Sequence, residues 1–193
     1  MSRVGTVEVK KVEIIEIFNQ GVGKAFGTEL IETSGDPLYL PQGDCGKPSR
    51  IYFANGFVQS AFHEIAHWCI AGPGRRKLED YGYWYDPDGR SVERQQEFQK
   101  FEAKNQGLEW HMYSTVDLPF HVSFDNLSQG ICDQSSFARS IRTNALIFHH
   151  LGMPPRARTF IRDVCEYFGT KHSYEKFWAD VCQRELMPAY ISS

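Results

Sequence analysis

The segment that most constrains this chain reads H-E-x-x-H, with His63 and His67 at its ends and Glu64 after the first histidine. It lies in a predicted helix, Phe57 to Ala71, that stops at Gly72-Pro73-Gly74. Two imidazoles four residues apart on a helix project from the same face, so both can reach one metal ion. Ordinary residue frequencies give such a string by chance on the order of once in two hundred chains of this size. A metal site on a helix is therefore the leading hypothesis, although the pattern identifies neither the metal nor the reaction.

The two faces of this helix differ in polarity. The apolar side consists of Phe57, Ala61, Phe62, Ile65, Trp68 and Cys69. The opposite side consists of Ser60, His63, Glu64, His67 and Ala71. This division is typical of an internal helix whose polar strip lines a cavity.

Hydrophobic spacing and turn residues predict the other elements. Helical spacing covers Val7–Leu30, weakened by Gly21 and Gly23, and extended segments are expected at Leu38–Leu40 and Arg50–Ala54. Further helices are predicted over Ser91–Tyr113, Ser135–Leu151, Ala157–Phe168 and Tyr174–Leu186. The fold class is therefore α+β: a predominantly helical single domain, 1–193, with a small strand component packed beside the H-E-x-x-H helix. Residues 1–10 and the last few are expected to be less ordered.

Composition narrows the class of protein. The net charge of −3 and the single short basic cluster, Arg75-Arg76-Lys77, do not predict direct nucleic-acid binding. No apolar run reaches membrane length, and none follows the charged N-terminus, so neither a membrane span nor a secretory signal is predicted. Five cysteines without a CxxC pair indicate free thiols in a reducing compartment, and the cytoplasm is the expected location.

A metal site with two histidines needs a third protein ligand, usually a carboxylate, and open positions for water, oxygen or substrate. On the predicted helix Ser91–Tyr113, Glu102, Gln106 and Glu109 share one face. We favour Glu102, which follows the apolar Phe101, and rank Glu109 second, although a solvated Glu102 fits the periodicity equally well. Predicted turns hold weaker candidates: Asp80, Asp86, Asp117 and Asp125.

The remaining histidines do not extend this site. His149 and His150 are adjacent and point about 100° apart on a helix, so their joint ligation of one metal is not expected. His111, His121 and His172 have no partner at ligand spacing, and such histidines are more often structural or exposed.

Two reaction classes use two histidines and a carboxylate at a metal. In a zinc-dependent peptidase, Glu64 would be the general base and metal-bound water would attack a peptide carbonyl. In a non-haem iron oxygenase, the same ligand types leave open positions for oxygen. A non-catalytic protein with a structural metal site is the third interpretation, which a fourth protein ligand would support.

A wider set of residues favours one of these classes. Around the motif lie Asn55-Gly56-Phe57, Ser60-Ala61 and His67-Trp68-Cys69-Ile70-Ala71-Gly72. Downstream lie Gly82-Tyr83-Trp84-Tyr85, Pro87-Asp88-Gly89-Arg90 and Glu102-x-Lys104-x-Gln106-x-Leu108-x-Trp110. Together with Pro119-Phe120, Val122-Ser123 and Asp125-Asn126-Leu127, this set resembles the bacterial elongation factor P hydroxylase family over most of residues 12–165.

The resemblance implies a metal-dependent, oxygen-using hydroxylase whose partner is elongation factor P, modified at a lysine that already carries a β-lysyl group. Carried over by position, the metal ligands are His63, His67 and Glu102. Fe(II) is the expected metal, and another divalent metal can replace it in purified protein. Glu64 is then a catalytic group that transfers protons or supports the ligands. Because the usual iron triad has H-x-D spacing on a barrel, cosubstrates such as 2-oxoglutarate are not implied.

The aromatic and acidic segment of residues 81–90 suits this substrate. Aromatic faces bind ammonium groups by cation–π contact, and acidic side chains supply counter-charge. The expected substrate-binding residues are Tyr83, Trp84, Tyr85 and Asp86. The segment is predicted to lie over the metal cavity, with packing in the core as the alternative.

Overall fold

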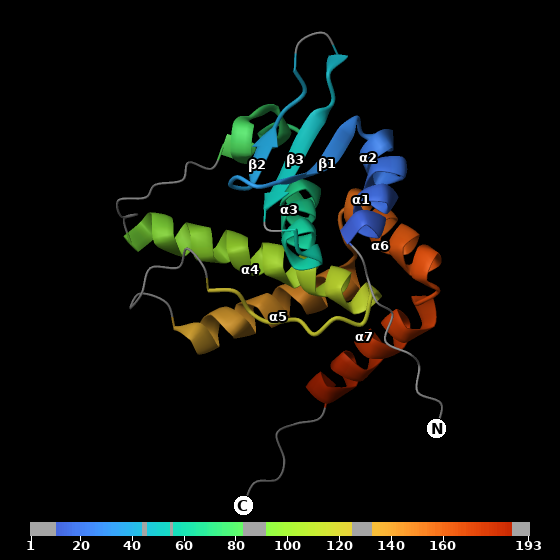
Figure 1. The fold of residues 1–193 in the computed structure, drawn as a ribbon. Helices are drawn as coiled ribbons and strands as arrows, with labels where there is room; N and C mark the ends of the chain where they lie inside the picture. Colours follow the sequence, from blue (N-terminus) through green and yellow to red (C-terminus); the bar gives the residue numbers. More distant parts are fainter. Residues whose placement is uncertain (1–10, 44–45, 55, 83–91, 125–132, 187–193) are drawn as a thin grey trace, which may run out of the picture.

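A small mixed sheet lies at one side of the computed structural model, which describes residues 11–43, 46–54, 56–82, 92–124 and 133–186 (Figure 1). Its strands are β1 (Thr28–Thr33), β2 (Leu38–Leu40) and β3 (Ser49–Ala54), in the order β1-β3-β2. The central strand β3 pairs parallel with β1 and antiparallel with β2. Both extended segments predicted from the sequence are therefore confirmed.

The N-terminal helical prediction is only partly right. Helix α1 spans Lys11–Gln20 and α2 spans Val22–Ala25, but the predicted helix over Val7–Leu30 is wrong at its C-terminal end. Gly27 has a φ of +59°, which turns the chain, and Leu30 then lies in strand β1 opposite β3. Pairing with a strand some twenty positions away decides the conformation here, and helical spacing cannot detect it.

Longer helices make up most of the described chain. They are α3 (Val58–Ile70), α4 (Val92–Thr115), α5 (Gln134–Leu151), α6 (Pro155–Phe168) and α7 (Lys171–Leu186), with short 3-10 turns η2 (Arg75–Lys77) and η3 (Glu79–Gly82). Each predicted helix downstream of the sheet is confirmed to within a few residues. Among the described residues, no helix has the length and apolar character needed to cross a membrane.

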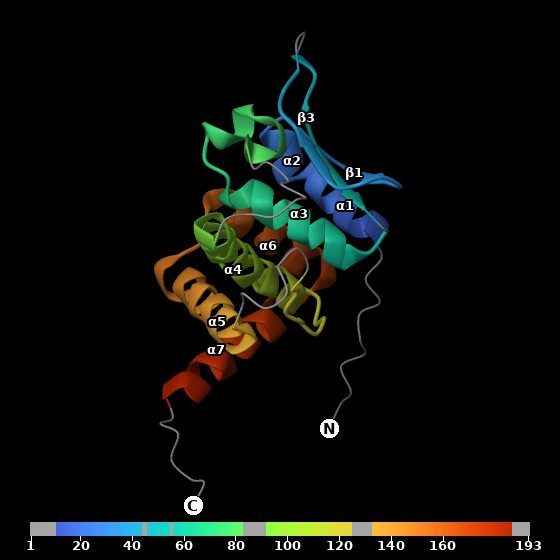
Figure 2. The same cartoon turned by 90° about the vertical axis from the view of Figure 1, so that its left-hand side faces the viewer.

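Helix α3 occupies the middle of the layers. The sheet and α1 lie on one side of it and α4 on the other, with α5 beyond α4 (Figures 1 and 2). Its apolar face is buried: Phe62 and Ile65 are fully buried, and Trp68 packs edge-on against Phe18 of α1. Phe57, predicted on this face, is instead 64% exposed because it precedes the helix. The predicted α+β architecture, mostly helical with a small sheet beside this helix, is confirmed.

Two arginines donate hydrogen bonds to backbone carbonyl oxygens at the C-terminal end of α3. Arg156, buried on α6, donates to the carbonyl oxygens of Cys69 and Ala71 and stacks its guanidinium over Trp68. Arg76 donates to the Ala71 oxygen as well. Since the last carbonyls of a helix lack partners within it and carry negative partial charge, these contacts fix where α3 ends and how it sits.

A glycine brings α4 and α5 close together. A Cβ atom placed on Gly107 would lie 2.8 Å from Cβ of Asn144 and 2.9 Å from the backbone nitrogen of Ala145. No real side chain fits at that separation, so glycine at this position permits the close packing of the two helices. This close packing on α5 holds α4 in position, with its opposite face turned toward α3.

Candidate metal centre

Helix α3 presents two imidazoles on its polar face, as the sequence predicted. His63 and His67 lie one turn apart with their rings nearly perpendicular, and their Nε2 atoms are 3.1 Å apart. The His63 side chain is 29% exposed and that of His67 14%, so this part of the helix is not sealed in the core. Part of each imidazole side chain is therefore open to solvent.

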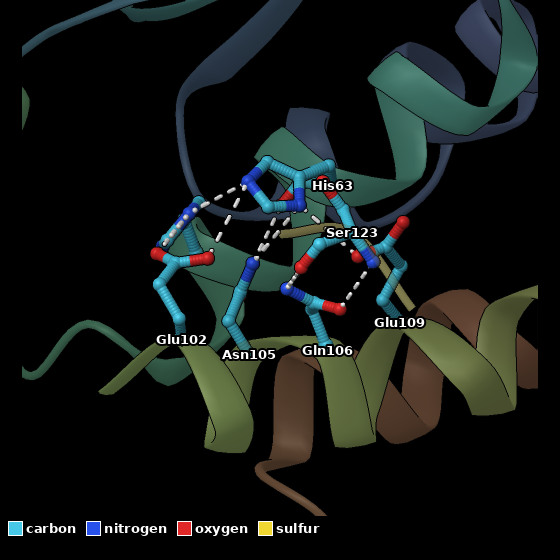
Figure 3. Close-up of polar contacts among 7 residues, drawn as sticks. His63, Glu102, Asn105, Gln106, Glu109 and Ser123 are labelled. Carbon is cyan, nitrogen blue, oxygen red and sulfur yellow. Dashed lines mark hydrogen bonds and ion pairs between the residues drawn. The ribbon is translucent and has the colours of Figure 1, made fainter. Parts of the chain in front are cut away.

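Helix α4 faces these histidines with an unusual row of buried polar side chains (Figure 3). Glu102, Asn105, Gln106 and Glu109 are each at most 7% exposed. Buried polar groups need partners: Glu102, Asn105 and Glu109 contact the histidines of α3, whereas Gln106 bonds the Ser123 backbone. The predicted common face of Glu102, Gln106 and Glu109 is thus present, and the alternative of a solvated Glu102 is wrong.

Glu102 converges with both histidines. Its Oε1 lies 3.4 Å from Nε2 of His67, and its Oε2 lies 4.0 Å from Nε2 of His63. Metal–ligand bonds to nitrogen and oxygen are about 2.0–2.2 Å, so two donor atoms on one ion are at most about 4.4 Å apart. All three separations fall within this limit, and His63, His67 and Glu102 therefore fit a metal ion.

Glu109 contacts the other side of the His63 ring. Its Oε2 lies 3.0 Å from Nδ1 of His63, on the nitrogen that faces away from His67 and Glu102 (Figure 3). Glu109 therefore accepts the Nδ1 proton and leaves the Nε2 lone pair for a metal, an arrangement common around metal-bound histidines. Sequence reasoning ranked Glu109 as a second candidate ligand; its position instead suits it to orient His63.

The electrostatics of the site favour a cation. Burial by itself lowers the pKa of His63, but the carboxylates of Glu109, Glu64 and Glu102 together outweigh it and raise the pKa to about 10. His67 behaves in the opposite way, because burial and then the charge on His63 lower its pKa well below the usual value. The His63 imidazole thus holds a proton, and with it one positive charge, among several carboxylates. A metal ion would replace that proton.

Glu64 lies beside the ligands rather than among them. It is not part of the described cluster whose donor atoms converge. Burial raises its pKa to about 7, an effect that His63 opposes and Glu102 and Asp80 reinforce. A carboxyl group with this pKa can both accept and donate a proton near neutral pH.

Sequence reasoning missed Asn105 and the stacking of Phe101 at this site. Asn105 extends its amide nitrogen to within 3.4 Å of the His63 backbone oxygen, while its own Oδ1 is buried without a partner among the described residues. Phe101 and Tyr81 both stack on the His67 ring, at centroid distances of 5.4 and 6.5 Å. An unpaired buried acceptor beside a candidate ligand is the kind of group that a bound water or substrate satisfies. No spacing in the sequence predicted these contacts.

Tyr81 is the first residue of the predicted substrate segment, and it is packed rather than open. Its ring lies 4.2 Å from that of Tyr39 in a parallel stack, and only 5% of the residue is exposed. Both Asp80 and Tyr81 have positive φ, and the Asp80 carboxylate accepts the backbone N–H of Tyr39. For Tyr81, packing is therefore the right interpretation, and Asp80 holds a turn.

The other predicted substrate-binding residues, Tyr83, Trp84, Tyr85 and Asp86, lie outside the described residues. So does Asp125, one of the weaker ligand candidates. The part of the chain described before Tyr83 ends with Gly82 and with Tyr81, whose ring stacks on His67.

Comparisons with known proteins agree on one family. The family model described as "Elongation factor P hydroxylase" matches residues 17–177. A protein of Haemophilus influenzae named "Elongation factor P lysine hydroxylase" is 42% identical over 165 residues, which cover 86% of this chain and 93% of that protein. Both matches include every residue of the candidate metal centre.

Proposed function

Since this chain belongs to the elongation factor P hydroxylase family, we propose that it hydroxylates a modified lysine of elongation factor P with Fe(II) and molecular oxygen. The lysine carries a β-lysyl group, as the sequence resemblance implies. One oxygen atom enters a C–H bond of that side chain, and the other leaves as water after taking up two electrons from a reductant and two protons. Because the substrate is a translation factor, the proposal places the enzyme in the cytoplasm.

One observation carries the metal assignment: donor atoms of His63, His67 and Glu102 converge from two separate helices. These residues would hold the ion, and Fe(II) with two histidines and a carboxylate supplies oxygen-activating chemistry at its open positions. In the described residues no fourth side chain joins this cluster, which suits a catalytic site better than a closed structural one.

The surrounding residues have separable tasks in this proposal. Glu109 holds the His63 ring through Nδ1, so that Nε2 faces the metal position. Glu64 moves a proton near the ligands, since the pKa of its carboxyl group lies at about 7. Phe101 forms an apolar wall against His67 and limits the access of bulk water.

Substrate binding is assigned to the segment after Tyr81. We expect Tyr83, Trp84 and Tyr85 to contact the ammonium groups of the modified lysine, with Asp86 as a counter-charge. Support comes from the position of Tyr81 beside His67, since the segment starts there.

The test uses Fe(II)-loaded protein, β-lysylated elongation factor P and ascorbate, under air and under nitrogen, with intact-mass readout. A parallel reaction adds an extract of cells that lack this protein, as a second source of electrons. A gain of about one oxygen atom in air alone supports the proposal. Cleavage of the substrate with or without oxygen would instead indicate a zinc peptidase, in which Glu64 activates water.

Matched variants locate the activity. Glu102→Ala should abolish the mass gain, whereas Glu97→Ala, an exposed position on the same helix, should not. Unmodified elongation factor P should be the poorer substrate because it lacks the added ammonium groups. No mass gain in either reaction, together with a metal that chelators cannot remove, would favour a structural metal site.

A further inference from the structure

A second group of metal-ligand side chains lies where the end of α5 meets α7. It comprises His149 and His150, in the last turn of α5, and Cys182 of α7. One donor atom from each lies within 4.8 Å of the other two. The group shares no residue with the centre on α3 and α4, and the proposed hydroxylation does not use it.

Neighbouring aromatic rings orient one of these histidines. The His149 ring stacks on Trp178 at a centroid distance of 5.7 Å and on His111 at 6.3 Å, nearly parallel in both cases. Trp178 and His111 are fully buried, so His149 rests on a rigid support. Partial burial and then the adjacent His150 lower the pKa of His149, which keeps it neutral and able to bind a metal.

The second histidine and the cysteine are already at ligand distance. The Cys182 Sγ lies 3.6 Å from Nε2 of His150. Bonds of about 2.3 Å to sulfur and 2.1 Å to nitrogen, at a tetrahedral angle, place these two atoms about 3.6 Å apart. The His149 donor atom lies within 4.8 Å of these two, and by moving closer it would complete three of four tetrahedral positions, with water in the fourth.

We propose that His149, His150 and Cys182 bind one Zn²⁺ ion at a peripheral site that ties α7 to the end of α5. Thiolate and imidazole ligands select zinc over the hard cations Mg²⁺ and Ca²⁺. The C-terminal end of α5 adds favourable negative partial charge for any cation bound there. The ion would stabilise the packing of α7, whose Trp178 and Tyr174 cover His111 of α4.

This convergence was not expected from the sequence. Adjacent helical positions point about 100° apart, but long side chains at a helix end can turn toward each other. The His149 and His150 rings lie 5.2 Å apart at 77°. Cys182 lies 32 residues from His150, and only the packing of α7 brings it near.

The test counts metal in the whole protein after stripping and reloading. His63→Ala removes one of the two α3 ligands and should leave the centre on α3 and α4 with well below one equivalent, so a full equivalent of zinc in this variant belongs elsewhere. We expect it to keep one equivalent of Zn²⁺, and to lose that equivalent when Cys182→Ser or His150→Ala is added. His172→Ala, an exposed histidine on α7, is the matched control and should keep it.

Two further readouts make the outcome unambiguous. Co²⁺ in the His63→Ala protein should give thiolate-to-cobalt absorption, which disappears with Cys182→Ser. Zn²⁺ should raise the melting temperature of His63→Ala but not of the Cys182→Ser double variant. Equal zinc content in these two proteins, or no thiolate absorption, would overturn the proposal and leave Cys182 and His150 as a simple hydrogen-bonded pair.

Discussion

Glu109 and His63 face each other across the space between α4 and α3, with Oε2 of Glu109 3.0 Å from Nδ1 of His63. This contact decides which nitrogen of His63 is left for a metal. Glu109→Gln keeps the size of the side chain but removes its charge. We expect metal affinity to fall about 10- to 100-fold while the fold is kept, as measured by competition with a chelator. Glu97→Gln on the exposed face of α4 is the control, and equal affinity in both variants would contradict the role of Glu109.

The three candidate ligands should behave as a unit. Replacing His63, His67 or Glu102 singly by alanine should reduce bound Fe(II) to well below one equivalent and abolish turnover, because two ligands hold a divalent ion poorly. The circular dichroism spectrum should stay close to that of the unmodified protein. A Glu102→Ala protein with full metal content and activity would rule out Glu102 as a ligand.

Glu64 should be separable from the ligands. Because its carboxylate is outside the converging cluster, Glu64→Gln should retain metal while turnover falls about 10²- to 10⁴-fold through loss of proton transfer. Metal analysis beside a single-turnover assay measures both quantities. Metal loss as large as that of His63→Ala would instead make Glu64 a ligand.

Gly107→Ala tests the packing that supports the site. Alanine favours an isolated helix by about 1 kcal/mol over glycine. Here its Cβ meets Asn144 and the α5 backbone below 3.0 Å, so we expect a net loss of about 1–3 kcal/mol in the free energy of unfolding. Urea denaturation measures it, and Lys104→Ala, exposed on α4, should change stability by less than about 0.5 kcal/mol. A stabilised Gly107→Ala protein would show that the helices can separate without cost.

His111 should make the protein sensitive to acid. It donates through Nε2 to the Ala145 oxygen and accepts from the Tyr174 hydroxyl through Nδ1, so it is held neutral. Burial is the main cause that lowers its pKa from 6.5 to about 3. The unfolded chain thus binds a proton that the folded chain excludes, and stability is lost as the pH falls from about 6.5 toward 3.

Between pH 7 and pH 5 this histidine alone should reduce the free energy of unfolding by about 2 kcal/mol. His111→Gln can keep both hydrogen bonds and does not titrate. Over the same pH range its free energy of unfolding should therefore fall by about 2 kcal/mol less than that of the unmodified protein. The measurement is urea denaturation at both pH values with a chelator present. Parallel pH dependence in the two proteins would mean that His111 is protonated in the folded state.

Local sequence patterns determined the elements of the site. The four-residue spacing of His63 and His67 places both rings on one face of α3, because helix geometry relates residues within a turn. The same periodicity put Glu102 and Glu109 on one face of α4. That Glu102 comes near the histidines was favoured from its apolar neighbour and from the family resemblance, and its role as a ligand stays a prediction.

Only the tertiary structure decided how these elements meet. Glu109 contacts Nδ1 of His63 rather than the metal position, and Leu30 pairs in strand β1. Cys182 lies next to His150. Each of these outcomes depends on the distance and angle between separate elements. Those are set by packing such as the close approach at Gly107, and periodicity within one element holds no information about them.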